Sequence, residues 1–436
     1  MDSTMVYGPR PAAMRARRMQ AIYVPQSGAT DVGGGTTIRI NIGTAPAQYL
    51  LTSSTVLKFS VKNTGAYNLD GSAGASAFIE TLRVYHGANM LEEVTGMGRL
   101  CSILSDVTRT PGEQGSIGSL TAGQSGIEPP TATTPTAAEV NAIARVCKLV
   151  RTPAVDGLGA ATRTFTIPLV SGVIGSLARQ AFPLTAATAA DLRVEIVLAA
   201  EKNPVQNSSG ADPAWTASDF SIITDILELS PESEALVVAS TGGQFQMNTQ
   251  SYRQSTAVVA KDSTRSSILL PFRFSSMNSI LLAHYAQTVT NNYTNAYTAR
   301  SRANLTEYYF RIGNSHVPAN PVQLGAVGVL PAEGFVNVLK AFHINVGNIQ
   351  IGNSCTSGNF NKAEPTTSHG TFCVAQELEA FGPGSSSKVE SGVNTLSQTV
   401  FFEGTYATVP NAMDVAAWAF HDVRLDFVSG TCRAMI

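Results

Sequence analysis

Short segments with a period of two residues recur along this chain from Tyr49 to its end. In the stretch STVLKFSVKN, Leu57, Phe59 and Val61 fall on one face, and Lys58 falls on the other. Strict alternation of this kind is typical of a strand with one buried face. Similar segments follow, namely AFIETLRVYHGANMLEEV (77–94), RTFTIPLVSG (163–172), SSILLPFRFSSMNSILLAHY (266–285), VNVLKAFHINV (336–346) and TLSQTVFFEGTY (395–406). The pattern predicts an all-β protein.

Only two helices are expected. TAAEVNAIARVCKLVRT (136–152) opens with a capping box and carries an apolar stripe. A shorter helix is predicted in EVTGMGRLCSILSDV (93–107), where apolar residues recur at helical spacing. The intervening stretches are rich in Gly, Ser, Thr, Asn and Pro, which predicts long loops.

One strand-like phrase occurs twice. DLRVEIVLA (191–199) and DVRLDFVSG (422–430) match in alternation and in the order of their charges. We interpret them as the corresponding strand in each of two similarly built halves. The chain of 436 residues is long enough for two or three domains, and residues 231–250 read as the joint between the halves. We therefore expect an N-terminal arm at 1–37 and two β-sandwiches or jelly rolls at 38–240 and 241–436.

Residues 1–37 contain no convincing strand and are expected to form an extended basic arm. The arm carries Arg10, Arg15, Arg17 and Arg18, and no acidic residue lies between positions 2 and 31. These arginines are candidates for binding phosphates of nucleic acid or lipid headgroups. An arm that docks on a neighbouring subunit also explains them, so both interpretations stay open.

Charge is unusually sparse. Asp, Glu, Lys and Arg make up 14% of the chain, the net charge is −2, and hydrophobic residues make up 44%. Such a surface indicates extensive coverage by other copies, or a neutral extracellular β protein. No apolar run is long enough to span a membrane, and no secretory signal is apparent. The cysteine count of five is odd, without any C-x-x-C pair, which favours buried free thiols made in a reducing compartment.

The sequence carries no motif of a known catalytic centre. Nucleophile-elbow, phosphate-loop, dinucleotide-binding and zinc-protease motifs are all missing from it. The six histidines are scattered and read as solvated turn or strand residues. The carboxylate pairs Glu92–Glu93 and Glu377–Glu379 have a spacing open to acid–base chemistry, but we interpret them as solvent-facing strand edges. We expect no enzyme activity, cofactor, metal or small-molecule substrate, and Trp418 is expected in the core.

Several phrases resemble double jelly-roll major capsid proteins of icosahedral DNA viruses. This is the lineage of adenovirus hexon and of tailless membrane-containing phages, and the capsid proteins of polinton-like viruses look most similar. The resemblance rests on FIETLRVYHGANMLEEVTGMGRLCSILSDV (78–107), FTIPLVSGVIGSLARQAFPL (165–184), ILLPFRFSSMNSILLAHY (268–285), SRANLTEYYFRIGNSHVPANPV (301–322) and AWAFHDVRLDF (417–427). Together these phrases span most of residues 40–436.

This resemblance implies two consecutive eight-stranded jelly rolls with few short helices and long loops. It implies a capsid building block of the virion, made inside the host cell, that forms homotrimers and then a pseudo-hexameric lattice. Penton and minor capsid proteins would be further partners, with the genome or an internal membrane reached through the arm. The alternatives are a secreted or cell-surface protein of two β-sandwiches that binds carbohydrate, and a single-jelly-roll capsid protein with a protruding domain.

Overall fold

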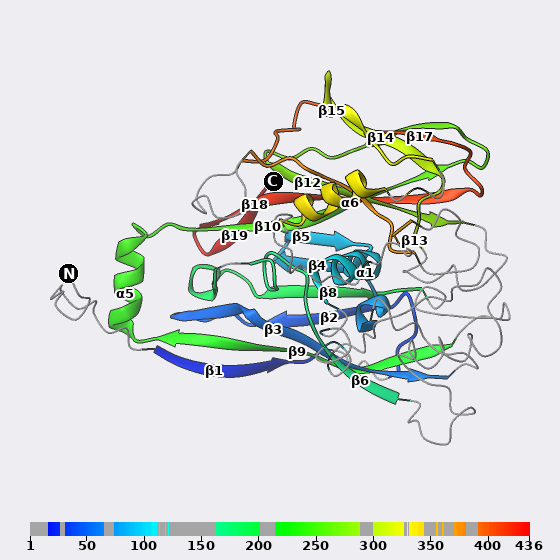
Figure 1. Ribbon diagram of the computed structural model, residues 1–436. Helices are drawn as coiled ribbons and strands as arrows, with labels where there is room; N and C mark the ends of the chain where they lie inside the picture. The colour runs from blue at the N-terminus through cyan, green and yellow to red at the C-terminus, as the bar shows by residue number, and fades with distance from the viewer. Residues whose placement is uncertain are drawn as a thin grey trace, which may run out of the picture.

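The structure is a computed structural model. It describes residues 16–26, 31–64, 74–110, 162–178, 180–200, 214–287, 300–326, 331–343, 370–380 and 391–436, with the single positions 113, 118, 121, 329, 355, 360 and 361. The helix expected at residues 136–152 lies outside these ranges. Two strand-built halves lie one above the other in Figure 1.

The first half contains two antiparallel sheets. One has the strand order β1–β9–β3–β6, with the short β7 on β3, and the other has the order β2–β8–β4–β5. The strands are β1 (Ala16–Tyr23), β2 (Thr37–Ile42), β3 (Gln48–Asn63), β4 (Ile79–His86), β5 (Asn89–Thr95), β6 (Thr162–Pro168), β7 (Phe182–Pro183), β8 (Leu192–Leu198) and β9 (Trp215–Leu229).

The second half repeats this plan. One sheet has the order β10–β18–β12, with β13 and β16 on β12 and β19 on β18, and the other has the order β11–β17–β14–β15. The strands are β10 (Phe245–Val259), β11 (Arg265–Leu270), β12 (Met277–Ala286), β13 (Arg300–Ser301), β14 (Leu305–Ile312), β15 (Ser315–Gln323), β16 (Val374–Glu377), β17 (Val400–Tyr406), β18 (Met413–Val428) and β19 (Thr431–Met435).

The two halves share the order of eight strands in chain sequence. In each half the first strand pairs with the last, the last with the third, and the second with the seventh. β7, β13 and β19 are additions to this pattern. Two sheets connected in this way form a jelly roll. The expectation of an all-β chain with two eight-stranded jelly rolls is confirmed.

The interpretation of the repeated phrase is wrong. Its first copy forms β8, the seventh strand of the first roll, whereas its second copy lies in β18, the last strand of the second roll. By its position in the roll, β8 corresponds to β17, and β18 corresponds to β9. The two phrases resemble each other because both pack apolar alternate residues into the same core. The buried residues are Leu192, Val194, Ile196, Val423, Leu425 and Phe427.

The outward faces of the two phrases also match. Arg193 Nε lies 3.3 Å from Glu195 Oε1, and Arg424 Nε lies 3.1 Å from Asp426 Oδ1. An apolar inner face and an ion pair two residues apart on the outer face produce the same letter pattern at two different strand positions. The two halves are alike in the order of their strands, but the repeated phrase is not evidence for that likeness.

The expected arm is also wrong over part of its length. Residues 16–23 form β1, an edge strand whose eight residues pair with β9, from Ala16 opposite Leu229 to Tyr23 opposite Ile222. An exposed edge strand that carries arginines has the same composition as an unstructured basic segment. Since β1 is the first of the eight strands, the first roll begins before residue 38. The division between residues 240 and 241 stays a prediction.

Few helices accompany the sheets. The shorter predicted helix is confirmed as α1 (Met97–Thr108). The segment expected as a strand near residue 336 is instead α6 (Ala332–Ala341), because Phe335, Val338 and Leu339 recur at helical spacing. A third helix, α5 (Pro231–Ser240), follows β9, and short 3₁₀ turns form η2 (Gly74–Phe78) and η4 (Leu184–Ala186). Within the described ranges, no helix has the length and apolar character needed to cross a bilayer.

Two apolar cores hold the rolls, and each takes residues from both halves of the chain. The first core includes Val423, Leu425, Phe427 and Cys432 from β18 and β19, beside residues of β2 to β9. The second core includes residues of α1 from the first half, namely Leu100, Ile103 and Val107. The rolls are therefore interlocked rather than joined by a linker alone.

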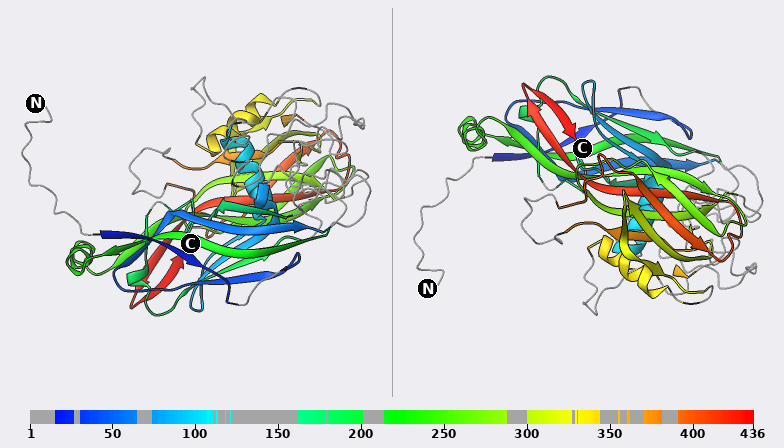
Figure 2. Two further views of the ribbon diagram at one scale, coloured as in Figure 1. Left: turned by 90° about the horizontal axis from the view of Figure 1, so that it is seen from below. Right: turned by 90° about the horizontal axis from the view of Figure 1, so that it is seen from above.

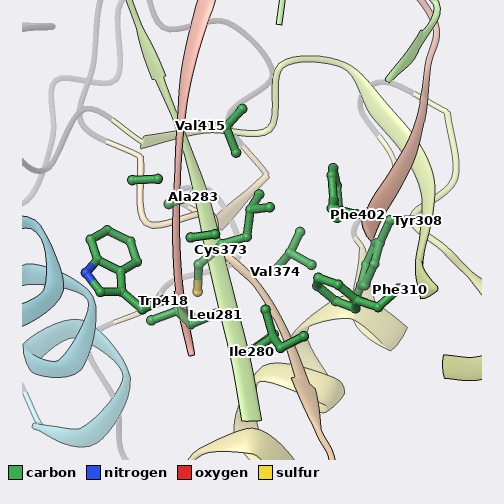
Figure 3. Close-up of a cluster of buried hydrophobic side chains, with 14 of the residues drawn as sticks. Ile280, Leu281, Ala283, Tyr308, Phe310, Cys373, Val374, Phe402, Val415 and Trp418 are labelled. Atoms are coloured by element: carbon green, nitrogen blue, oxygen red, sulfur yellow. The ribbon is translucent and has the colours of Figure 1, made fainter. Parts of the chain in front are cut away.

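The first half of β18 is buried on both faces. Residues 415–419 form the continuous buried run VAAWA. In Figure 3, Trp418 lies on the side of a helix of the first half, while Tyr308, Phe310 and Phe402 lie on the opposite side. The expectation that Trp418 belongs to the core is confirmed, since its side chain is fully buried and its Nε1 donates to Thr95 O at 3.2 Å.

The interlocked cores predict that a change late in the chain destabilises the first roll. Leu425→Ala removes a fully buried side chain from the first core and should lower the free energy of unfolding by about 2–5 kcal/mol. Val428→Ala on the same strand, where the side chain is 65% exposed, should change it by no more than about 0.5 kcal/mol.

Denaturant unfolding measures both variants, and hydrogen exchange should show faster exchange in β2 and β8 for Leu425→Ala. A loosening confined to β10 and β12 would contradict the shared core.

Candidate functional site at the junction of the two rolls

A buried carboxylate lies where the two rolls meet. Glu92 on β5 has 5% of its surface exposed and accepts hydrogen bonds from four donors. Its Oε1 accepts from Gly172 N at 2.8 Å and from Ser251 Oγ at 2.5 Å, and its Oε2 accepts from Val173 N at 3.4 Å and from the Ser171 hydroxyl. Ser251 belongs to β10 of the second roll, so the carboxylate joins both rolls.

The backbone approaches closely at this point. Thr249 Oγ1 donates to Gly172 O at 2.5 Å, and a Cβ at Gly172 would collide with the backbone oxygen of Gln250. Only glycine allows the loop after β6 to lie against β10. Burial raises the pKa of Glu92, although its hydrogen bonds act in the opposite direction.

The neighbouring Glu93 forms an ion pair on each side. Its Oε1 lies 2.8 Å from Arg83 Nε on β4, and its Oε2 lies 2.6 Å from Arg253 Nη1 on β10. The interpretation of Glu92–Glu93 as a solvent-facing edge is therefore wrong. Both carboxylates contact side chains of β10, so both act as structural contacts between the rolls.

A second polar contact connects α1 to the second roll. Asp106 on α1 forms an ion pair with Arg300, whose side chain is fully buried. Cys355 Sγ donates to Asp106 O at 3.4 Å. A buried charge is stable only when it is paired, so this contact fixes α1 against the second roll.

The C-terminal strand is attached to the first roll through a histidine. His86 Nδ1 accepts from Cys432 N at 3.1 Å, and its Nε2 contacts Ala187 O at 2.9 Å. His284 and His421 are also buried, and burial lowers the pKa of each to about 4. The expectation of solvated histidines is wrong for these three. They form part of the core because each finds a hydrogen-bond partner there.

The second carboxylate pair surrounds His343, just after α6. Glu377 Oε1 lies 3.6 Å from His343 Nδ1, and Glu379 Oε2 lies 3.3 Å from His343 Nε2. The two carboxylates contact different ring nitrogens, so they lie on different sides of the imidazole and do not converge on one reacting atom or ion. Across the described part of the chain, no group of three His, Cys, Asp or Glu residues could hold a metal ion.

Of the four arginines in the expected arm, the structure describes two. Arg17 and Arg18 lie on β1, where Arg17 is opposite Glu228 and Arg18 Nε donates to Asp225 Oδ2 at 2.9 Å. Arg10 and Arg15 lie outside the described residues. At least Arg18 is thus partly neutralised within its own chain.

The cysteines agree with the expected thiols where the structure describes them. Cys101, Cys373 and Cys432 are buried and Cys355 is half-buried, and all four are free. Burial raises the pKa of Cys101 to about 11 and that of Cys373 to about 12, so both are protonated at neutral pH.

Sequence reasoning did not find the junction. Ser251 is 159 positions from Glu92, and nothing local to either residue predicts the contact. One feature of the sequence points to polar partners for β5. Glu92 and Glu93 are consecutive and lie between Leu91 and Val94, so one carboxylate on each face of the strand needs hydrogen-bond donors or a cation.

The fold is shared with capsid proteins of known structure, although no family model and no curated protein matches the sequence. The PBCV-1 virus capsid is 10% identical, with 100% of both chains covered and a TM-score of 0.62. The Faustovirus major capsid protein is 9% identical, covering 97% of this chain and 92% of that one, with a TM-score of 0.62. The mavirus major capsid protein is 10% identical, covering 100% and 93%, with a TM-score of 0.54. The expected likeness to the double jelly-roll fold is confirmed over the whole chain.

The junction predicts a strong dependence of stability on Glu92. Glu92→Leu leaves the hydroxyls of Ser171 and Ser251 and the amide of Gly172 without an acceptor, which costs about 1–3 kcal/mol for each group. Glu92→Gln keeps one acceptor oxygen and should cost less. Unfolding in denaturant compares the two, and equal losses would contradict an acceptor role.

The Glu92→Gln variant, compared with the unmodified protein in denaturant unfolding at several pH values, tests the pKa of Glu92. Because the folded-state pKa of Glu92 is raised, its stabilising effect is present below the usual glutamic acid range and is lost as pH rises through the folded pKa. The stability of Glu92→Gln relative to the unmodified protein should therefore increase with pH.

Proposed function

We propose that this protein is a major capsid protein, the building block of an icosahedral virus shell. The observation that carries the proposal is the pair of jelly rolls with one strand order, in a chain that aligns end to end with capsid proteins of known structure. Its role is structural rather than catalytic. Its place is the virion, after synthesis in the reducing interior of a host cell, which suits its free thiols.

The topology suits a homotrimer. Three copies with two similar rolls each present six similar faces around a three-fold axis, which is the symmetry that a hexagonal lattice requires. The polar contacts at Glu92, Glu93 and Asp106 favour one fixed orientation of the two rolls, and a regular lattice needs that. Low overall charge suits large lateral contacts between copies. Penton and minor capsid proteins would complete such a shell.

The alternative is a secreted or cell-surface protein of two β-sandwiches that binds carbohydrate. That function favours paired cysteines, whereas the described cysteines are free. It also favours a monomer, so oligomeric state separates the two proposals.

Size exclusion with light scattering tests the proposal directly. We expect a species of three times 45.8 kDa from purified protein, and closed particles in electron micrographs at assembly concentration. A stable monomer that forms no particle under any assembly condition would contradict the capsid function and favour the alternative.

The segment before β1 is proposed to act between capsomers on the inner side of the shell. Arg10 and Arg15 precede β1, and arginine pairs with either carboxylates or phosphates in a bidentate manner. The partner is a neighbouring capsomer, an anionic membrane or the genome. Arg17 and Arg18 extend this basic stretch onto the exposed face of β1.

Deletion of residues 2–15 tests this role while β1 stays intact. Trimers should persist, because the rolls keep all their strands, while closed shells should fail or become salt-sensitive. Replacing Arg10 and Arg15 by Gln is the matched control for charge alone. Loss of the trimer, or normal shells from the deletion variant, would refute the role.

A further inference from the structure

The helix α5 is exposed on nearly all sides. Among its ten residues only Ser233 is buried, while Leu236 is 56% exposed and Val238 is 37% exposed. Its sequence PESEALVVAS is acidic in the first turn, and the five consecutive apolar residues that follow lie around the rest of the helix rather than along one stripe. A helical segment that is apolar all round is normally buried, whereas most of these residues of α5 are exposed in the single chain.

The helix is nevertheless held firmly at its N-terminal end. Ser230 caps it by accepting from Ser233 N at 3.3 Å, and Tyr49 donates to Glu234 at 2.9 Å. Its N-terminal turn carries Glu232 and Glu234, and no basic residue lies in its last turn. The helix is thus a fixed, acidic and apolar projection.

The β18–β19 hairpin lies at the same end of the molecule (Figures 1 and 2), and its outward face carries a second set of exposed apolar residues. Val428 is 65% exposed, Met435 is 52% exposed and Ile436 is 50% exposed. On this face, Arg424 is opposite Met435 and Asp426 is opposite Arg433 in the strand register. Two arginines and one aspartate leave it with a net positive charge.

The inward face of the hairpin is anchored. Cys432 is buried and its backbone contacts His86 and Asn89, and Ala189 N donates to Gly430 O at 3.0 Å. The hairpin is therefore a rigid surface whose outer side carries apolar and basic groups, the complement of α5.

We propose that α5 of one copy docks on the outward face of the β18–β19 hairpin of a second copy. Both surfaces are apolar, and their charges are opposite. A single contact of this kind uses α5 of one copy and the hairpin of the other, and repeating it around a three-fold axis joins three copies in a ring. A lipid surface fits α5 less well, since membrane-lying helices have one apolar and one basic face. This proposal rests on the proposed function and names one contact by which copies assemble.

A cysteine cross-link tests the contact in the full-length chain. The double variant Leu236→Cys with Met435→Cys should form disulfide-linked oligomers on mild oxidation of trimers or shells. Each single variant should give none. The matched control, Leu236→Cys with Leu269→Cys, pairs α5 with an apolar residue on β11 that is 54% exposed, and should also give none.

Charge reversal gives an independent readout. Glu232→Arg should reduce the assembled fraction, and adding Arg433→Glu should restore it. Cross-linking together with this rescue would support the contact. Assembly of the double-cysteine variant without an interchain disulfide would overturn it and leave the capsid function standing. If the unmodified protein forms neither trimers nor shells, the capsid function itself fails. Vesicle binding that Leu236→Asp abolishes, with assembly unchanged, would assign α5 to lipid and overturn the proposal.

Discussion

The structure depends on one strand that serves both cores. β18 runs for 16 residues, and its first part is buried on both faces inside the second roll. Its last part turns Val423, Leu425 and Phe427 into the first core. In return, α1 packs on the outer face of the sheet that contains β18. The apolar area of each roll is thus completed only by the other half of the chain, which makes the hydrophobic effect act on the pair rather than on each roll alone.

Polar contacts then fix the orientation that the shared cores permit. Apolar packing is non-directional, whereas the acceptor positions of Glu92 and the ion pairs of Glu93 and Asp106 are satisfied in one arrangement only. Leaving the buried Glu92 or Arg300 without a partner costs more than the net energy that a normal hydrogen bond contributes. The junction therefore penalises other orientations. Under the proposed function the two rolls occupy neighbouring positions of one lattice, and a fixed orientation keeps those positions regular.

The sequence predicts local features of this fold well and distant contacts poorly. Alternation identified strands such as β3 because a period of two needs only neighbouring residues, and α1 followed from helical spacing in the same way. β1 is not evident from the sequence because its inner face is short and only half-buried, with Met19, Ala21 and Tyr23, while arginines and the exposed Ile22 obscure the alternation. The repeated phrase misled because similar environments produce similar letters at unrelated strand positions. The junction could not be predicted, since the burial of Glu92 depends on β10, a strand of the other half.

The shared core also means that the first roll is completed late in folding, before assembly. β18 lies far along the chain, so most of the first roll is synthesised before Leu425 and Phe427 are available to complete its core. Until then the first roll exposes apolar surface at the site where β18 and β19 will pack, and such surfaces favour aggregation. The hairpin that completes the first core also carries the outward face of Val428 and Met435. One folding step therefore buries the inner face of this hairpin and presents its outer face, so that a copy acquires this surface only after both rolls are complete.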